Sequence, residues 1–574
     1  MTMAETTTRA DLDPRIDTYH FYEREWEGYE QLIDAFEHDV PDQFNLVTYL
    51  CDRWAEADPN RVAVHALGAD GTETRYTYGD LRRDANRLAN HLVDAGIDAG
   101  DRIAVHGGQK VEYLLAHLAA WKVGAISVPL SLLFGPDGLE YRLADSGASA
   151  FVVDEAALPT LRAVEPDLDE LETKVVVGDG STEGNEAAFH DAIADRSTDV
   201  ETATTDADDP AVVMYTSGTT GPPKGVVHAH RSVLGVLPGQ ILTRYNMDVR
   251  AGDTLYTPGE WSWSGPLFDV IMSGLYLGVP IVGNADPGFD PEGTLALIDR
   301  FDVSIVGAPA TVWRALMQVP EASERYDLGS LRVVFNGGEA LGGSIVGWFH
   351  ETIGGVAVHE VYGQTETAAA GAGDCEALGI DHRDGYMGKP VPGLEIDVLD
   401  VDDTDPLGTG EVGELAVRYD SNPSCFLEFW NAPEKTARRL DDGWLRTEDL
   451  GSKTDDGYVS FHSRKDDVIN SSGYRIGPAE IEECLAGHDA VADAGVIGVP
   501  DEMRGEVPKA FVVLAEGNEA TDELSEVLRG HVESRLAKYE RPRELEFVSE
   551  LPTTTTGKVR RYDLRVRERP TETE

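Results

Sequence analysis

The stretch from Tyr215 to Val226 carries the clearest chemistry in the chain. It reads Tyr-Thr-Ser-Gly-Thr-Thr-Gly-Pro-Pro-Lys-Gly-Val and follows an apolar run, which predicts a loop after a strand. Glycine adopts backbone angles that other residues avoid and leaves amides open to a ligand oxygen, while hydroxyls and a lysine add donors and charge. We predict a polyphosphate-binding loop whose groups come from Thr216, Ser217, Gly218, Thr219, Thr220, Gly221 and Lys224.

An ordinary Gly- and Thr-rich turn is the plainer alternative. Such turns rarely gather four hydroxyls, three glycines and one of a chain's eleven lysines within ten residues. The loop also lacks the closing Gly-Lys-Ser/Thr of kinase and GTPase loops. Later, Asn336–Ala340 and Val361–Glu366 each follow an apolar strand-like run. Ligands in parallel α/β sheets bind beyond the carboxyl ends of strands, so these two turns and the loop can converge on one pocket.

These motifs, in this order, resemble the adenylate-forming superfamily, which contains acyl-CoA synthetases, luciferase and peptide-synthetase adenylation domains. The resemblance implies ATP, Mg²⁺ and coenzyme A, and a reaction through an acyl-adenylate. It implies that Gly338, Glu339 and Ala340 line the adenine and that Tyr362 stacks on it. Thr365 would hold the α-phosphate and Glu366 the metal, consistent with the preference of Mg²⁺ for carboxylate and phosphate oxygen. The same strand would add Glu360, Val361, Gly363 and Gln364 to the nucleotide site.

Three further segments extend the resemblance. Trp444–Asp449 is similar to the family's ribose motif, in which Asp449 would accept both sugar hydroxyls. The family usually has Gly where this chain has Glu448, which leaves the backbone turn there open. In Arg464–Gly477, Arg464 and Arg475 would meet the nucleotide and Asp466 would be the hinge. Ser472, Gly473, Tyr474 and Arg504 would serve coenzyme A, and Lys558 in Thr553–Lys558 would be the catalytic lysine. A disordered basic tail is the alternative for Lys558.

The acyl pocket is predicted less sharply. Across residues 45 to 567 the motifs look most like medium-chain acyl-CoA synthetases. Acetate-specific relatives carry a Trp where this chain has Gly363, so we expect room for several more carbons, each worth about 0.8 kcal/mol when buried. Trp261 and Trp263 could refill that space, with Gly337 also at the pocket. His228 and His230 have poor zinc spacing and are interpreted as ordinary polar residues, near the acyl end of the pocket.

The composition limits the partners. With 104 acidic and 48 basic residues in 574, the formal net charge is −56, which argues against nucleic acid and anionic lipid. The acids are spread along the chain, a composition that resembles proteins of salt-loving organisms. Four widely spaced cysteines predict a reducing compartment without a disulfide frame or zinc site. Residues 1–13 lack a signal-peptide pattern and the apolar Tyr113–Phe134 window is broken, so we expect a cytoplasmic protein without a membrane span.

Alternating short strands and helices predict an α/β fold with helix-covered parallel sheets. Residues 1–463 would form a large N-terminal adenylation domain that ends in a strand-rich part, and 464–574 a small mobile α+β domain. We expect a peripheral arm before residue 45 and a polar excursion over Asp154–Pro210.

The function predicted is ATP-dependent activation of a short-to-medium-chain acid, followed by transfer to coenzyme A. An acetate or propionate ligase, an adenylation domain serving a carrier protein, and a non-catalytic nucleotide or acyl sensor are the alternatives. A sensor has no use for a lysine that serves the transition state, so Lys558 weighs against it.

Overall fold

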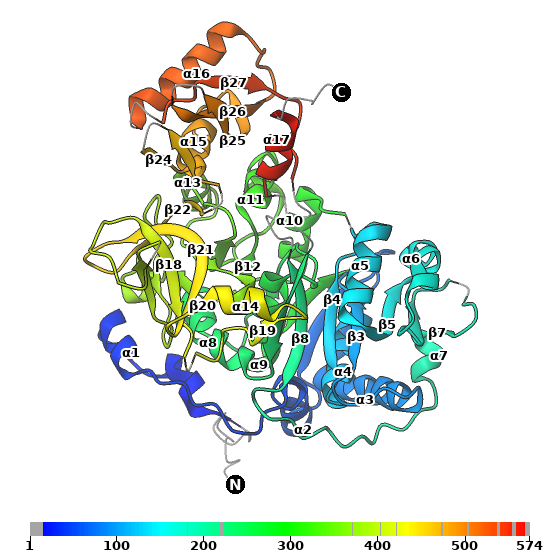
Figure 1. Cartoon of the computed structure of the whole chain (residues 1–574). Helices are drawn as coiled ribbons and strands as arrows, with labels where there is room; N and C mark the ends of the chain where they lie inside the picture. Colours follow the sequence, from blue (N-terminus) through cyan, green and yellow to red (C-terminus); the bar gives the residue numbers. More distant parts are fainter. Residues whose placement is uncertain are drawn as a thin grey trace.

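A computed structural model gives the arrangement of the chain (Figure 1). It describes residues 15–180, 182–216, 223–286, 288–369, 371–401, 403–420, 422–465, 467–471, 474–501, 504–536, 540–553 and 558–568. The fold is mixed α/β, with a large N-terminal domain and a small C-terminal domain that lies above it in Figure 1. The fold class predicted from the sequence is therefore confirmed.

One large sheet carries the predicted phosphate-binding loop. In the described residues its order is β19 (Glu428–Phe429), β9 (Lys224–Ala229), β8 (Pro210–Thr216), β4 (Ile126–Leu130), β3 (Arg102–His106), β5 (Ala148–Asp154), β6 (Thr173–Val177) and β7 (Glu186–Ala188). Strands β3, β4, β5 and β6 run parallel, whereas β8 and β9 form an antiparallel pair. Its helices are α3 (Tyr78–Asp94), α4 (Val111–Lys122), α5 (Pro136–Ser146), α6 (Leu158–Val164) and α7 (Phe189–Ile193).

Helix α3 shows how local sequence sets these boundaries. Thr77 and Asp80 form a capping box, with each side chain bonded to the other residue's backbone, so the helix begins at Tyr78. The apolar Tyr113–Phe134 window contains most of α4, which is buried on nearly every side, followed by β4. No helix among the described residues is long and apolar enough to cross a membrane.

A second large sheet carries the two turns predicted to bind nucleotide. In the described part of the chain its order is β16 (Lys389–Pro390), β15 (Gly371–Gly373), β14 (Ala357–Gly363), β13 (Val333–Gly337), β12 (Ile305–Gly307), β10 (Leu255–Tyr256), β11 (Ile281–Asn284), β1 (Val62–Leu67) and β2 (Glu73–Thr77). Strands β10 to β14 pair in parallel where they are neighbours, so their carboxyl ends share one edge. The associated helices include α8 (Ser232–Thr243), α9 (Ser273–Leu277), α10 (Pro291–Arg300), α11 (Ala310–Met317), α12 (Ala322–Arg325) and α13 (Gly343–Thr352).

A smaller antiparallel sheet completes the N-terminal domain and leads into the C-terminal one. It contains β17 (Ile396–Leu399), β18 (Gly413–Arg418), β20 (Leu440–Asp441), β21 (Trp444–Lys453) and β22 (Val459–Arg464), with α14 (Pro433–Arg439) beside it. The C-terminal domain has its own sheet and core, built from β23 (Ile469–Ser471), β24 (Tyr474–Ile476), β25 (Val491–Asp501), β26 (Gly505–Leu514), β27 (Glu544–Phe547), α15 (Pro478–Ala486), α16 (Asp522–Arg535) and α17 (Arg561–Glu568).

Two sequence expectations need correction. Asp154–Pro210 is not an excursion, because β6 and β7 inside it extend the first large sheet and Val175, Val176 and Val177 are buried. The segment before residue 45 is not merely peripheral, because its described part has a buried side. Tyr19 and Leu32 there are fully enclosed, and α1 (Tyr29–Ala35) bonds to the body through Tyr29 and the carbonyl of Pro390.

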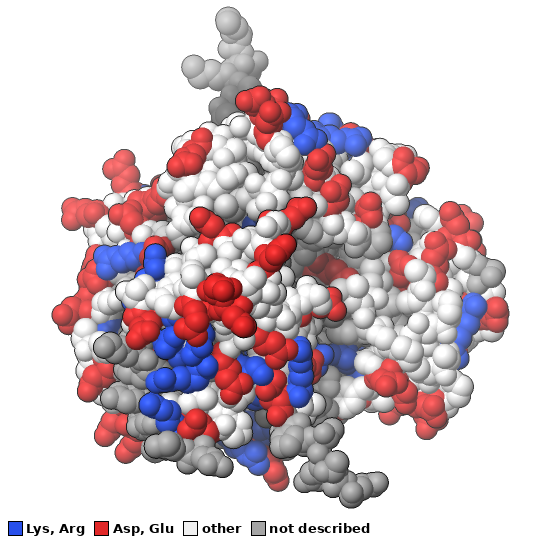
Figure 2. Space-filling model, turned by 90° about the horizontal axis from the view of Figure 1, so that it is seen from above, with Lys and Arg blue, Asp and Glu red and all other residues white. Residues whose placement is uncertain are grey.

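The charge on the face around the C-terminal domain is mostly acidic. Figure 2 shows Asp and Glu scattered over this face, with Lys and Arg in smaller groups among them. Two of the eleven lysines, Lys122 and Lys174, are fully buried in ion pairs with Asp52 and Glu165. These two lysines stabilise the interior and add no positive charge to the surface, on which acidic residues predominate.

Candidate nucleotide and acyl-transfer site

The two turns predicted to bind nucleotide lie side by side. Strands β13 and β14 run parallel with Gly337 opposite Val361, so Gly338–Ala340 and Tyr362–Glu366 leave the same sheet edge. The Leu341 amide donates to Glu360 across them, at 3.4 Å. Glu339 turns its carboxylate to the Thr311 amide and hydroxyl, at 3.0 and 2.8 Å. The chain order predicted this meeting of turns, and the parallel register produces it.

The predicted phosphate-binding loop connects β8 to β9, which pair as antiparallel strands. Thr216 ends β8 opposite Lys224, the first residue of β9. The predicted residues Ser217, Gly218, Thr219, Thr220 and Gly221 lie outside the described residues. The base of the loop is tied to the second turn, because the Leu427 amide donates to the carbonyl of Val227 at 2.7 Å and the Phe426 amide to that of Glu366 at 2.8 Å.

The predicted ribose carboxylate sits at the centre of a hydrogen-bond network. Asp449 is 4% exposed. It accepts from the Tyr362 hydroxyl at 2.7 Å and from the Arg464 guanidinium at 2.8 Å, and Gln364 also donates to it. Burial and the adjacent Asp449 charge raise the pKa of Tyr362 well above its ordinary value, so the phenol stays protonated and can donate. The network fixes Tyr362, Asp449 and Arg464 relative to one another.

Glu366 is the carboxylate predicted to bind the metal. Arg439 donates to its Oε1 at 2.9 Å, and the Glu366 side chain is 13% exposed. Burial acts to raise the pKa of Glu366, but the Arg439 charge and a backbone donor outweigh it and hold that pKa below its ordinary value. Among the described residues no group of three or more His, Cys, Asp or Glu could hold a metal. One ionised carboxylate beside the phosphate-loop hairpin fits Mg²⁺, which is commonly held by one or two carboxylates together with substrate phosphates.

Glu448 resolves the open question of the ribose turn. Its φ is 61°, in the left-handed region that favours glycine, which explains why the family usually has Gly there. The turn forms with Glu all the same. The Glu448 amide donates to Glu414 at 3.1 Å and its carbonyl accepts from Lys465 at 2.7 Å.

Lys558 reaches the first nucleotide turn from the C-terminal domain. A Cβ placed on Gly338 would lie 3.2 Å from Cε and 3.3 Å from Nζ of Lys558. The residue as a whole is exposed, yet its surroundings desolvate the ammonium group and lower the pKa of Lys558, while the charges of Glu339 and Asp449 oppose that change. Of the basic residues after it, Arg561 pairs with Asp467 and Glu482 inside the C-terminal domain, whereas Arg560 and Arg567 are half exposed. Lys558 thus belongs to an ordered segment, not to a disordered basic tail.

Two of the coenzyme A candidates, Tyr474 and Arg504, lie in or next to strands of the C-terminal sheet. Ser472, Gly473 and the hinge candidate Asp466 lie outside the described residues. Tyr474 and Arg475 are in β24, where their backbones pair with Ser471 and Asn470. Ser471 also pairs with Gly505, which brings the exposed Arg504 to the same edge as the β23–β24 turn.

The acyl-pocket candidates are placed differently from the expectation. A Cβ on Gly363 would lie 2.4 Å from the carbonyl oxygen of Ala369, so the missing side chain is matched by close backbone packing and leaves no empty space there. The Trp261 ring instead covers Gly283, 3.0 Å from a Cβ placed there. Trp263 packs edge-on against Phe134, with ring centroids 6.1 Å apart. Gly337 faces Val361.

Sequence reasoning did not single out Arg439, and it interpreted His228 as an ordinary polar residue. Arg439 ends a short polar helix whose composition gives no signal, and its role depends on contacts with distant residues. His228 is fully buried and feels the Glu366 charge, but burial dominates and lowers the pKa of His228 to about 4. His228 is therefore a neutral group beneath the second nucleotide turn, and its position directly after the loop was the available signal.

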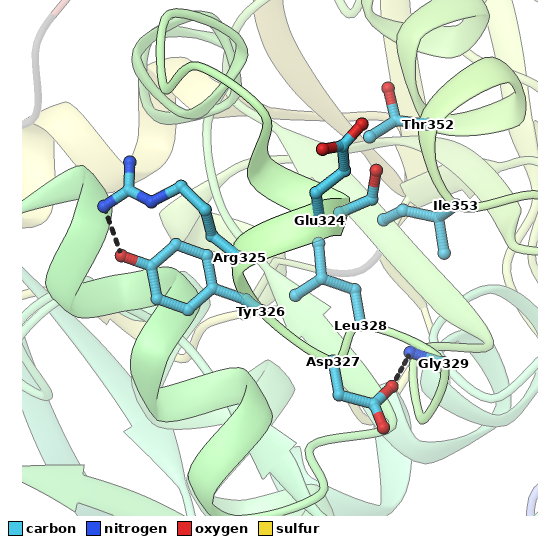
Figure 3. Close-up of a pocket in the computed structure, with 9 residues that line it drawn as sticks. Glu324, Arg325, Tyr326, Asp327, Leu328, Gly329, Thr352 and Ile353 are labelled. Atoms are coloured by element: carbon cyan, nitrogen blue, oxygen red, sulfur yellow. Dashed lines mark hydrogen bonds between the residues drawn. The ribbon is translucent and has the colours of Figure 1, made fainter.

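A surface pocket of about 460 Å³ lies away from these residues. Figure 3 shows it between residues 323–329 and the end of α13, with Arg325 turned to the Tyr326 hydroxyl and Asp327 bonded to the Gly329 amide. Its lining includes none of the candidate site residues, so we assign it no part in the chemistry.

Two features define the adenylate-forming class. The chain has a large α/β body and a small C-terminal domain, and a lysine of the small domain reaches the predicted nucleotide turns of the large one. Residues 51–427 match the model of the "AMP-binding enzyme" family, and residues 480–558 that of the "AMP-binding enzyme C-terminal domain". The chain therefore belongs to the AMP-binding enzyme family.

Similar proteins of known type are acyl-CoA synthetases and CoA ligases. It is 31% identical to the rat mitochondrial acyl-coenzyme A synthetase ACSM3, with 97% of each chain covered. It is 34% identical to human mitochondrial acyl-coenzyme A synthetase ACSM5, covering 92% of this chain and 91% of the relative. The crystal structure of the anthranilate CoA ligase AuaEII with anthranoyl-AMP superposes with a TM-score of 0.84 at 29% identity, covering 92% of this chain and 98% of that one. The protein is an AMP-forming acyl-CoA ligase that uses ATP and coenzyme A with a small carboxylic acid, and Mg²⁺ is the metal of this family.

Proposed function

We propose that this ligase activates a short-to-medium-chain carboxylic acid, using Lys558 for adenylation and a second orientation of its C-terminal domain for thioester formation. The observation that carries the proposal is the approach of Lys558 to Gly338, with Glu339 and Asp449 close enough to act on its charge. Residues 1–463 act as the adenylation domain and 464–574 as the moving domain, with Asp466 as the hinge.

In the first step a carboxylate oxygen attacks the α-phosphorus of ATP, and the bond to the leaving pyrophosphate breaks. Two anions must approach, so a positioned ammonium is the chief requirement. Lys558 supplies it on the side of Gly338. Lys224 and the hydroxyls of the β8–β9 turn hold the outgoing phosphates, and Thr365 orients the α-phosphate. Glu366 would hold Mg²⁺, which when bound would neutralise phosphate charge.

The nucleoside end is held by groups that are already ordered. Gly338, Glu339, Ala340, Glu360 and Val361 line the adenine, and Tyr362 stacks on it. Asp449 accepts the ribose hydroxyls and Arg464 orients that carboxylate through their 2.8 Å bond. Two or more donors orient a carboxylate before the ligand binds, so little free energy is lost in ordering it when the ligand arrives.

In the second step the coenzyme A thiol attacks the acyl carbonyl, forming the thioester as AMP leaves with the electron pair of the cleaved bond. Ser472, Gly473, Tyr474 and Arg504 serve coenzyme A. The pairing of Ser471 with Gly505 supports one continuous surface for them.

A substrate of intermediate size is favoured over acetate. The Trp261 ring packs over Gly283, so the indole does not take the place that a Trp holds at position 363 in acetate-specific relatives. Trp263 and Phe134 form an aromatic wall that suits an alkyl chain or a ring. A solved relative of this chain is an anthranilate CoA ligase, which supports including aromatic acids.

We further propose that the enzyme works in a salt-rich cytoplasm, on the basis of its net charge of −56. The test of the proposed function is carboxylate-dependent exchange of labelled pyrophosphate into ATP in molar KCl with Mg²⁺, over acids from acetate to octanoate plus benzoate. Exchange that peaks at an intermediate acid supports the proposal. A peak at acetate would assign the chain to the acetate or propionate ligases.

A further inference from the structure

One arginine nitrogen is shared between two carboxylates at the candidate metal site. Nη1 of Arg439 donates to Oε1 of Glu366 at 2.9 Å and lies 3.3 Å from Oε2 of Glu448. The rest of the guanidinium is held by neutral acceptors, the carbonyl of Arg446 and, at 3.2 Å, the side-chain oxygen of Gln364. With its side chain 6% exposed, Arg439 has little water to pair with in place of either acid.

The second carboxylate occupies a costly backbone position. Glu448 has a φ of 61°, which is unfavourable for any residue with a side chain. Strain of this kind persists where the surroundings impose it, and it clusters at functional sites. Here the strained residue directs its carboxylate between Arg439 and Arg464, 3.3 Å from each. Its side chain is 40% exposed, whereas that of Glu366 is 13% exposed.

Metal binding at Glu366 would bring the cation close to the positive charge of Arg439, and Glu448 can separate the two. A divalent cation on Glu366 would stand next to the positive charge of Arg439, because both would use the same carboxylate. Like charges at such distances repel strongly in a partly buried site. Glu448 lies within reach of the same Arg439 nitrogen and so offers an alternative acceptor without a large movement.

We propose that Arg439 is a counter-ion shared by Glu366 and Glu448. It pairs with Glu366 in the metal-free protein and turns to Glu448 when Mg²⁺ and ATP are bound. This inference rests on the proposed role of Glu366 as metal ligand. Arg439 and Glu448 are positioning residues, since neither is placed at the reacting atoms.

The test compares ATP affinity with and without the metal, by titration calorimetry in molar KCl. The measured quantity is the ratio of the ATP dissociation constant in EDTA to that in saturating Mg²⁺, in which direct effects on ATP cancel. Arg439→Gln removes the group that competes with Mg²⁺ for Glu366 and should raise this ratio. Glu448→Gln removes the alternative acceptor, so Arg439 stays paired with Glu366 and the ratio should fall. We expect changes of about fivefold or more, the usual size of coupling between two sites.

The neighbouring Arg438, whose side chain is 77% exposed, provides the matched control, and Arg438→Gln should leave the ratio unchanged. In the Arg439→Gln background, Glu448→Gln should have no further effect on the ratio. Arg439→Lys, which keeps the charge, guards against misfolding of the Gln variant, and thermal melting checks each protein. Shifts of the same sign in both single variants, or no shift in either, would overturn the proposal.

A further variant separates this inference from the proposed function. Glu366→Gln should lower the ratio, because Mg²⁺ should then improve ATP binding very little. If Glu366→Gln leaves the ratio unchanged, the metal role of Glu366 is wrong. If it lowers the ratio while the Arg439 and Glu448 variants behave like wild type, the metal role stands and the shared counter-ion is wrong.

Discussion

The side chain of Lys558 lies against the backbone of Gly338, where a Cβ would be 3.3 Å from the lysine Nζ. These residues are 220 positions apart and belong to different domains. Gly338 has a φ of 86°, and its lack of a side chain leaves the space that the lysine enters. The contact joins the nucleotide turn to the C-terminal domain in the arrangement expected for adenylation.

Gly338→Ala should reduce adenylation more than its effect on stability explains. An L-residue in this conformation costs about 1–2 kcal/mol, and the new methyl would also push Lys558 away. Gly342→Ala is the matched control, because Gly342 has a φ of 75° and nothing within 4 Å of its Cβ position. Pyrophosphate exchange and thermal melting would be measured for both. Equal losses of exchange at equal stability would show that the Lys558 contact is irrelevant.

The free energy of unfolding should fall as pH rises from about 5 to 8, because Glu360 keeps its proton only in the folded protein. Burial raises the pKa of Glu360 to about 8, with Asp374 and Glu483 acting in the same direction and His382 opposing. The native state keeps this proton over a range where the unfolded chain, near the ordinary value of 4.5, has lost it, so ionisation favours unfolding. The neighbouring Asp374 and Asp384 outweigh burial and raise the pKa of His382, which adds a loss of stability in the same direction.

Melting temperatures between pH 5 and 9 would check this. Glu360→Gln should flatten the decline, whereas Glu434→Gln, at a side chain that is 90% exposed, should reproduce the wild-type curve. A Glu360→Gln curve as steep as the wild-type one would refute the assignment.

Gly363→Ala should destabilise the fold, because its Cβ would meet the backbone of Ala369 at 2.4 Å. Overpacking of this kind typically costs about 1–3 kcal/mol. Gly347→Ala is the control, since Gly347 lies in α13 with nothing near its Cβ position, and alanine there should be neutral or stabilising by about 1 kcal/mol. Denaturant unfolding would compare the two. An unchanged Gly363→Ala protein would mean that space is available beside residue 363 after all.

Low salt should weaken the fold and the activity together. With a net charge of −56, repulsion among the acids is screened within about 3 Å at 1 M salt but reaches about 10 Å at 0.1 M. We expect the melting temperature to rise from 0.1 M to 2 M KCl. Sucrose at matched osmolarity, which favours burial without screening charge, should restore less of it. Equal stability and full activity at both salt concentrations would contradict the salt-adapted interpretation.

Much of the fold could be predicted because its signals are local. Alternating short strands and helices are predicted from the sequence, and this alternation builds both large sheets. The two predicted nucleotide turns meet because β13 and β14 are parallel neighbours, whose carboxyl ends share an edge. The predicted phosphate-binding loop follows β8 of the other large sheet, so the same parallel pairing does not fix its position.

What could not be predicted depends on long-range contacts. Strands β6 and β7 are short and sit among acidic residues, so only their pairing in the sheet reveals them. Gly363 seemed to open a pocket, but the space is taken by backbone six residues further along the chain. Arg439 gains its importance from Glu366, which is 73 positions away.

The most direct test of the account is pyrophosphate exchange by Lys558→Ala. Arg560→Ala, two residues further along and half exposed, serves as the control in the same tail. With its ammonium removed, Lys558→Ala should lose about a hundredfold or more of the exchange rate, while thioester formation from preformed acyl-adenylate continues and Arg560→Ala stays near wild type. Full exchange by Lys558→Ala would contradict the assignment of this lysine to the adenylation step.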